Sequence, residues 1–264
     1  MKVIQSDAVE GASGNALTVL GTSSKLTRIL GVTALLLVAM QLFLGLYYSE
    51  ADDKQGEAVR LFYVHVPSIL TAYLGFAITL VASIIYLRKG SQFWDLLAGA
   101  AAEVAVLFCA FALFTGSVWG ELTWGVYWQW DPRLTSTTVL FIMYLGYLAV
   151  RRLDLEPAVR ARRAAILGIV SFLNVIIVHY SVDWWRGLHQ EATFGTDTKL
   201  DDLMLFSFFI GWVAFTVILA WLIIHRFRVS WLEYQVRMDR LDEALADRRA
   251  EGGTKTTGTT GAVS

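Results

Sequence analysis

The sequence predicts an all-α integral membrane protein with six transmembrane helices, both termini in the cytoplasm, and a tryptophan-rich loop that faces outward. Of its 264 residues, 56% are hydrophobic and only 17% are charged, and the mean hydropathy is +0.52. So few polar residues cannot cover the surface of a soluble globule of this size. Six apolar runs of membrane-spanning length and an uneven placement of lysine and arginine support the same fold class.

Six nearly uncharged runs are the predicted spans. An α-helix needs about 20 residues to cross about 30 Å of hydrocarbon, and the fourth and fifth runs are near the short limit of about 17. Each run is expected to be helical because no water satisfies backbone groups in the hydrocarbon. We interpret the first run as a retained anchor, because Tyr-Tyr-Ser-Glu follows it instead of a small-residue cleavage site. The runs are Ile29 to Tyr48, Val66 to Leu87, Leu96 to Trp119, Leu134 to Val150, Ala164 to Tyr180 and Leu203 to Ile224.

Lysine and arginine fall mainly on one side of the predicted membrane. The N-terminus, the second loop, the fourth loop and the C-terminal tail carry 17 of them, and the opposite side carries five. The positive-inside rule therefore places the richer side, with both termini, in the cytoplasm. The five outward cations are Lys54, Arg60, Arg133, Arg186 and Lys199.

Three outward segments are rich in aromatic residues and histidine. They are "KQGEAVRLFYVHVPS" before the second span, "WGELTWGVYWQWDPRLTS" from Trp119, and "HYSVDWWRGLHQEATF" from His179. Because they share one membrane face, they are able to build a single site although they lie far apart in the sequence.

Tryptophan is concentrated on that outer face. Six tryptophans face outward and three face inward, and four of the outer six fall within twelve residues. An aromatic belt at the lipid interface would explain tryptophan on either face. The clustering instead favours a flat apolar platform for a large, planar, unsaturated group. The platform residues are Trp119, Trp124, Tyr127, Trp128 and Trp130, with Trp184 and Trp185 in the third segment.

Two of the four histidines, His65 and His189, lie in the outward segments. Singly, each suits a hydrogen-bonded structural role. As a pair beside an apolar aromatic platform, they match the two axial imidazole ligands of a porphyrin iron. His179 is a rival ligand or a supporting partner, and His225 is expected at the inner interface.

These motifs resemble a known family. "WGELTWGVYWQWDPRLTS" is similar to the WWD motif of the heme-handling membrane proteins of cytochrome c biogenesis. "RLFYVHVPS" and "HYSVDWWRGLHQ" resemble the two histidine-bearing segments of the six-span CcmC type. The chain departs from the motif at Tyr127, which replaces the first Trp of the usual pair. Pro132 after the Asp is common in the related CcsA type, whereas "RLTS" and the short chain favour CcmC.

The resemblance implies that heme b is held on the periplasmic face of a bacterial inner membrane by axial His65 and His189, against the platform. It implies that the protein presents heme to a membrane-anchored heme chaperone of the CcmE type. It also implies ABC transporter subunits of the CcmA and CcmB types and a small single-span subunit of the CcmD type as partners. Any lyase activity would be shared with the chaperone, because the sequence shows no nucleophile or general base of its own.

Four charged positions have more than one interpretation. Arg60 and Arg133 suit a clamp on the heme propionates or contacts with lipid head groups. Asp131, followed by proline, suits an N-cap, a direct role in the site, or both. Glu103, well inside the third span, either packs against a neighbouring helix or faces a partner or a wet cavity.

The remaining regions complete the predicted organisation. Residues 1–28 form a cytoplasmic segment, 29–225 the membrane domain with the platform at 119–136, 226–250 an amphipathic cytoplasmic helix, and 251–264 a disordered tail. Cys109, the only cysteine, is expected to be inert core. The lipid bilayer is the surrounding partner, and we expect no nucleic acid. An electron-transfer cytochrome and a secondary transporter are the alternative functions.

Overall fold

The protein is a bundle of long helices. The computed structural model describes residues 24–189 and 202–256, and the all-α prediction is confirmed. Six helices are long and apolar enough to cross a membrane, as predicted. The elements are α2 (Lys25–Leu42), a π-helical turn η1 (Phe43–Tyr48), a 3-10 turn η2 (Glu57–Leu61), α3 (Phe62–Lys89), α4 (Gln92–Trp124), α5 (Pro132–Val150), α6 (Pro157–Trp184) and α7 (Asp202–Thr256).

Capping residues set several helix ends. Asp131 and Glu156, each followed by a proline, accept backbone N–H groups of the first turns of α5 and α6. Gly90 and Gly125 end α3 and α4 with φ of +63° and +74°, a left-handed conformation that glycine adopts at little cost. The N-cap predicted for Asp131 is therefore confirmed.

Several helices extend past the apolar runs. α4 continues to Trp124, five residues beyond the predicted end of the third span, so part of the aromatic stretch is helical. α7 runs from the sixth span into the predicted cytoplasmic helix and on to Thr256, six residues past the expected end at 250. The predicted N-terminal segment up to residue 23 and the last eight residues lie outside the described residues.

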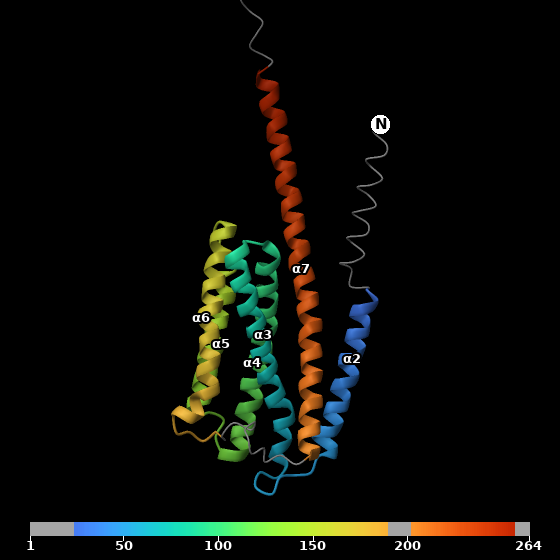
Figure 1. Cartoon of the computed structure of the whole chain (residues 1–264), viewed down its shortest axis with the longest axis vertical. Helices are drawn as coiled ribbons and strands as arrows, with labels where there is room; N and C mark the ends of the chain where they lie inside the picture. Colours follow the sequence, from blue (N-terminus) through green and yellow to red (C-terminus); the bar gives the residue numbers. More distant parts are fainter. Residues whose placement is uncertain (1–23, 190–201, 257–264) are drawn as a thin grey trace, which may run out of the picture.

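The helices pack side by side around a central α3–α4 pair. Figure 1 shows α5 and α6 on one side of this pair and α2 and α7 on the other, with α7 projecting far beyond the bundle. Small residues line the contact between α3 and α4. A Cβ added at Gly75 would lie 2.7 Å from Cβ of Ala105, so the two backbones approach closely there.

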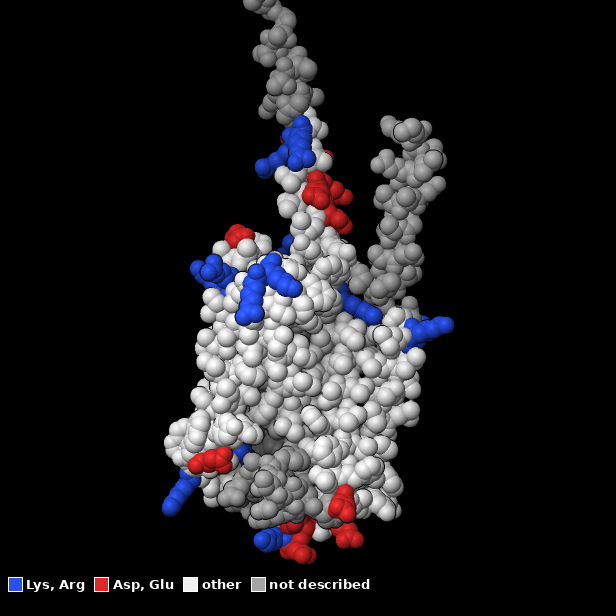
Figure 2. All heavy atoms as spheres, viewed as in Figure 1, with Lys and Arg blue, Asp and Glu red and all other residues white. Residues whose placement is uncertain are grey.

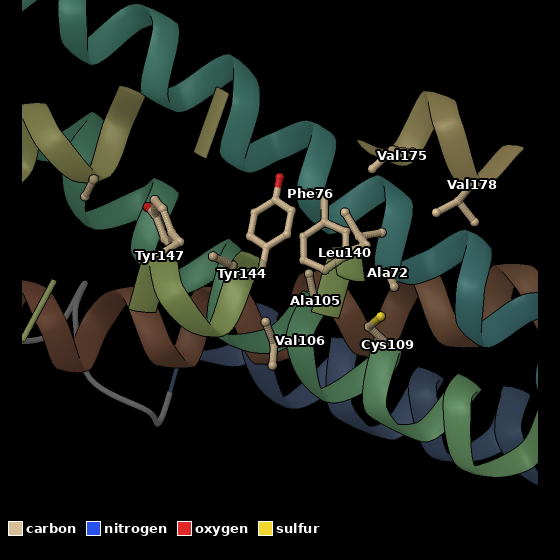
Figure 3. Packing of buried hydrophobic residues seen from close by; sticks show 12 residues of the cluster. Ala72, Phe76, Ala105, Val106, Cys109, Leu140, Tyr144, Tyr147, Val175 and Val178 are labelled. Carbon is tan, nitrogen blue, oxygen red and sulfur yellow. The ribbon is translucent and has the colours of Figure 1, made fainter. Parts of the chain in front are cut away.

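The core lies between α3, α4, α5 and α6. Phe76 stacks on Tyr144 with ring centroids 3.8 Å apart, and Tyr147, Leu140 and Cys109 are fully buried around them (Figure 3). Cys109 is thus a core residue, as predicted.

The two ends of the bundle differ in charge. Lysine and arginine gather at the end from which α7 projects, and acidic side chains dominate the opposite end (Figure 2). The loops that follow η1, α4 and α6 all lie at that opposite end. The assignment of the basic end to the cytoplasm stays a prediction from this asymmetry.

Candidate functional site

A cavity of about 210 Å³ opens at the end of the bundle that carries the aromatic loop. It lies among α3, the last turns of α4, the start of α5, the end of α6 and the segment after α6. His65 and His189 both line it, so the structure brings together the two histidines that the sequence singled out. The other lining residues on which the site depends are Gln55, Tyr73, Gly116, Trp119, Trp124, Arg133, Thr137 and His179.

His65 lies in the first turn of α3 and is held by α4. Its Nδ1 is 3.0 Å from the carbonyl oxygen of Ala112 and 3.2 Å from Oγ1 of Thr115. A carbonyl only accepts, so Nδ1 carries the proton and Nε2 has the lone pair that binds a metal. Gly116 makes room for the ring, because an added Cβ there would lie 2.7 Å from Cε1 of His65.

A buried glutamine supplies a hydrogen bond that the backbone beside His65 lacks. Pro67 lacks an N–H, which leaves the carbonyl of Tyr63 without its helical donor. Nε2 of Gln41, on α2, donates to that carbonyl at 2.7 Å, and Gln41 is buried. Helix α2 therefore supports the turn of α3 that presents His65.

His189 is held by the carboxylate of Asp131. Its Nδ1 lies 2.7 Å from Oδ1 of Asp131. Because a carboxylate only accepts hydrogen bonds, Nδ1 carries the proton and donates it, and Nε2 carries the lone pair. Oδ2 of Asp131 accepts the backbone N–H groups of Leu188 at 2.8 Å and His189 at 3.3 Å. Asp131 thus caps α5, as predicted, and also contacts His189. A direct role of Asp131 in the heme site stays a prediction.

The electrostatics of this pair follow from its surroundings. Burial raises the pKa of the Asp131 carboxyl, but nearby His189 and the backbone N–H donors outweigh it, and the net pKa lies below the usual value. Burial lowers the pKa of His189, and the Asp131 carboxylate offsets only part of that shift. A neutral imidazole beside an ionised carboxylate is the state that suits metal binding.

Two tryptophans of α4 pack against the two histidines. The ring of Trp119 meets His65 edge-on at 5.7 Å, and its Nε1 donates to Oε1 of Gln55 at 2.9 Å. The ring of Trp124 meets His189 edge-on at 4.9 Å. Each imidazole therefore has one aromatic neighbour and one polar anchor.

The other predicted platform residues lie outside the cavity lining. Trp130 is 80% exposed and Tyr127 63% exposed, while the loop that carries them is tied to α4 by Ser117, whose hydroxyl donates to the carbonyl of Tyr127 at 2.6 Å. The remaining exposed members of the set are Trp128, Trp184 and Trp185. The platform is therefore divided into two cavity-lining rings and an exposed aromatic surface.

The two predicted propionate-binding arginines are also separated. Arg133 lines the cavity, and its Nη2 donates to the carbonyl of His179 at 3.3 Å. Arg60 pairs with Glu57 and donates to the carbonyl of Leu46 at 2.6 Å, and it does not line the cavity. The structure brings only Arg133 to the histidines.

Four of the cavity residues named above were not predicted from the sequence: Gln55, Tyr73, Gly116 and Thr137. Tyr73 lies eight residues, or two helical turns, after His65 on α3, and Thr137 lies four residues, or one turn, after Arg133 on α5. For these two, the spacing from a motif residue was the available signal, since residues so spaced share a helix face.

The described residues contain no group of three or more His, Cys, Asp or Glu that would hold a bare metal ion. A histidine pair supplies two ligands, which suits a metal whose other ligands come from a macrocycle. The donor set thus fits a porphyrin iron better than a free cation.

Comparison with known proteins identifies the family. The sequence matches the family CcmC, heme exporter protein C, over residues 11–242. The chain belongs to the CcmC family. It is 36% identical over 229 residues to heme exporter protein C of Bradyrhizobium diazoefficiens, covering 83% of this chain and 87% of that protein. It is 33% identical over 217 residues to heme exporter protein C of Haemophilus influenzae, covering 79% and 86%.

A plant relative extends the CcmC match. A protein of Marchantia polymorpha, named as a putative cytochrome c biosynthesis ccmC-like mitochondrial protein, is 34% identical over 182 residues, covering 68% of this chain and 76% of its own. The CcmC match covers the first five membrane helices, most of the sixth and all three outward motifs, so the resemblance seen in those motifs is confirmed over residues 11–242.

Proposed function

We propose that this CcmC-family protein binds heme b between His65 and His189 and presents it to a membrane-anchored heme chaperone during cytochrome c maturation. The observation that carries the proposal is the pair of histidines at one cavity, each with Nδ1 engaged and with no hydrogen bond at Nε2 to any residue that the structure describes. Two independent anchors, a helix carbonyl and a carboxylate, select the same tautomer at both positions.

The protein's own residues bind and orient in this proposal. His65 and His189 would hold the heme iron, Trp119 and Trp124 pack beside them, and Arg133 would pair with a propionate. Heme supplies the iron that takes both imidazoles and the vinyl groups that are the site of attachment to the chaperone. The cavity of about 210 Å³ is smaller than the roughly 300–1,000 Å³ typical of ligand pockets, so part of the macrocycle would remain accessible.

The exposed aromatic surface suits the hand-over. Five aromatic residues at the same end of the bundle have exposed side chains: Tyr127, Trp128, Trp130, Trp184 and Trp185. Exposed apolar clusters of this kind are typical of interaction surfaces. We assign this surface to the exposed edge of the heme and to docking of a CcmE-type chaperone.

The proposed setting is a bacterial inner membrane, with the histidine cavity on the periplasmic side. The basic end of the bundle would face the cytoplasm, where α7 projects (Figure 2). The names of the relatives support a heme export assembly, and we propose CcmA- and CcmB-type ABC transporter subunits and a CcmD-type single-span subunit as its other members.

An electron-transfer cytochrome is the competing function for a histidine pair. Such proteins usually take both ligands from facing membrane helices. Here only His65 lies on a helix, whereas His189 comes from the segment after α6, at the edge of the bundle. This placement favours heme presentation, in which the bound heme is later released, over electron transfer.

The test is the absorption spectrum and heme content of the purified full chain, with and without the co-expressed chaperone. His65→Ala and His189→Ala should each lose heme or convert it from low spin to high spin. His225→Ala, which removes a histidine packed on Trp221 away from the cavity, is the matched control and should keep the wild-type spectrum.

Accumulation of heme without the chaperone, and its loss when the chaperone is present, would support presentation. A low-spin spectrum that survives both cavity substitutions would refute axial ligation by these residues. Heme that stays bound with the chaperone present and exchanges electrons with a quinol would favour the cytochrome function instead.

A further inference from the structure

A second pocket, of about 430 Å³, lies toward the basic end of the bundle, away from the histidine cavity. It lies among the first half of α4, the end of α5, the start of α6 and the middle of α7. Five arginines and three carboxylates line it, which leaves a net positive charge of two. The charged lining residues are Asp95, Glu103, Glu233, Arg151, Arg152, Arg160, Arg226 and Arg237.

Two of these arginines are fixed by ion pairs between helices. Arg151 binds Asp95 through both terminal nitrogens, at 2.6 and 3.1 Å. Arg226 binds Glu103, with Nη2 at 3.0 Å from Oε1 and Nε against the other carboxylate oxygen. These bidentate pairs join α4 to α5 and α7 and form rigid walls for the pocket.

Three arginines remain for a ligand. Among residues 24–189 and 202–256, no ion pair is formed by Arg152, Arg160 or Arg237. Arg152 and Arg237 are exposed and Arg160 is half-buried, so their guanidinium groups are accessible at the rim. The three guanidinium groups come from the segment just after α5, the first turn of α6 and the middle of α7. Such groups around one pocket suit a phosphate, which arginine binds bidentately.

Aromatic residues beside the pocket mark the level of the lipid head groups. Phe93 of α4 packs on Phe227 of α7 at 5.0 Å, and Phe227 stacks on Trp231 at 5.9 Å. Tyr234, the next residue of this series, lines the pocket itself and packs on Trp231. Tryptophan and tyrosine prefer the membrane interface, so the pocket opens at the depth where lipid phosphates lie.

We propose that this pocket binds the phosphate head group of an anionic phospholipid. A basic pocket between helices on the cytoplasmic side is suited to such a head group. The lining also contains Leu96, Leu148 and Ala161, apolar residues that suit the glycerol and upper acyl chain better than a free ion. The site is independent of heme binding, because it shares no lining residue with the histidine cavity.

The test measures which lipids the full chain retains. The protein is reconstituted in nanodiscs of phosphatidylcholine with a minor fraction of phosphatidylglycerol, re-extracted in detergent, and its bound lipids are quantified by mass spectrometry. Wild type should enrich phosphatidylglycerol over the bulk ratio. Arg152→Gln with Arg160→Gln should reduce the enrichment by about fivefold for each arginine removed, the worth of one basic residue at an anionic surface.

Two further variants make the result specific. Arg248→Gln with Arg249→Gln removes the same charge from an exposed part of the α7 extension and should leave the enrichment unchanged. Arg152→Lys with Arg160→Lys keeps the charge but not the bidentate geometry, so this variant should retain part of the phosphatidylglycerol enrichment. This lysine pair also keeps the test valid if the glutamine pair does not fold.

Inorganic phosphate distinguishes the two sources of a phosphate group. Retention of phosphatidylglycerol in excess inorganic phosphate supports the lipid, whereas displacement by it overturns the lipid assignment in favour of a soluble phosphate. No enrichment in wild type, or equal enrichment in the Arg152→Gln, Arg160→Gln variant, would overturn the proposal altogether.

Discussion

Substitution of Asp131 by asparagine separates its two structural roles. Oδ1 caps α5 by accepting hydrogen bonds from the backbone N–H groups of Arg133 at 2.9 Å and Leu134 at 3.3 Å. The same oxygen accepts a hydrogen bond from Nδ1 of His189. Oδ2 accepts the N–H groups of Leu188 and His189. Five donors thus meet one carboxylate, and all five need an acceptor.

An amide cannot satisfy both sets of donors. If the amide oxygen takes the place of Oδ1, its NH₂ group faces two backbone N–H groups; if the amide turns over, its NH₂ faces α5 and the His189 ring. A hydrogen bond to a charged group is worth about 1.5–3 kcal/mol. The first orientation therefore favours release of the Leu188–His189 segment, whereas the second uncaps α5 and leaves the His189 ring without its acceptor. Loss of such a carboxylate behind a metal-binding histidine costs about 10–100-fold in metal affinity.

The assay is a heme titration of the purified apoprotein, followed by the low-spin absorption band, beside thermal unfolding in the same detergent. Asp131→Asn should weaken heme binding by about 10–100-fold. The unfolding temperature should change little, because the amide oxygen still caps α5 in its favoured orientation.

A carboxylate at the same end of the bundle provides the control. Asp53→Asn removes an exposed charge in the loop between η1 and η2 and should bind heme as wild type does. Wild-type affinity and spin state in Asp131→Asn would refute the positioning role and leave Asp131 as an N-cap only. Weak binding in both variants would show that net charge, not the contact with His189, determines the affinity.

Three more predictions concern the histidine cavity and the ion pair at the opposite pocket. Gly116→Ala should displace the His65 ring, because the new Cβ would lie 2.7 Å from Cε1 of that ring. Overpacking of this kind costs about 1–3 kcal/mol, so the heme titration should show weaker binding. Heme affinity should fall on acidification with a midpoint below pH 6.5, because burial holds the pKa of His189 below that value and protonation removes the lone pair; a spectrophotometric pH titration measures it. Because the pKa of His189 is lowered in the folded state, its contribution to the free energy of unfolding is present above pH 6.5 and is lost as the pH falls. Glu103→Gln should lower stability by about 1–2 kcal/mol in thermal unfolding, because it leaves the charge of Arg226 without its carboxylate in a site about one-third exposed.

Two of these predictions have a control variant in the chain, and the pH prediction has an outcome that would refute it. Gly146→Ala adds the same methyl group where no atom lies within 4 Å, so it should leave heme binding intact. A pH midpoint above 6.5 would contradict a buried, neutral His189. Glu103→Gln combined with Arg226→Gln should regain stability, since the double change removes the unpaired charge. Equal unfolding temperatures in wild type and Glu103→Gln would show that the ion pair contributes nothing.

Much of the site could be predicted because its motifs are local. Asp followed by proline predicted the N-cap at Asp131, and the structure confirms it. The clustering of aromatic and histidine residues in three outward segments predicted that His65 and His189 share one site, and both line one cavity. Their role as heme ligands stays a prediction until the spectra are measured.

The helix ends were harder to predict than the spans. The apolar runs mark where a helix must lie in hydrocarbon, but helical hydrogen bonding continues past them until a cap or glycine ends it. Gly125 ends α4 after Trp124, which places that ring on the helix face beside His189 and leaves the next aromatic residues in a loop. Hydropathy alone carries no information about that division.

By itself, the sequence determined the fold class, the six spans and the family, because the hydrocarbon allows only helices there and because motif residues close in sequence are recognised without coordinates. Only the tertiary structure decided which polar groups meet. Asp131 reaches His189 across 58 positions and Glu103 reaches Arg226 across 123, while Arg60 turns away from the cavity to Leu46. Such pairings depend on how helices rotate and approach one another in packing, and periodicity along one helix does not specify its partner's rotation.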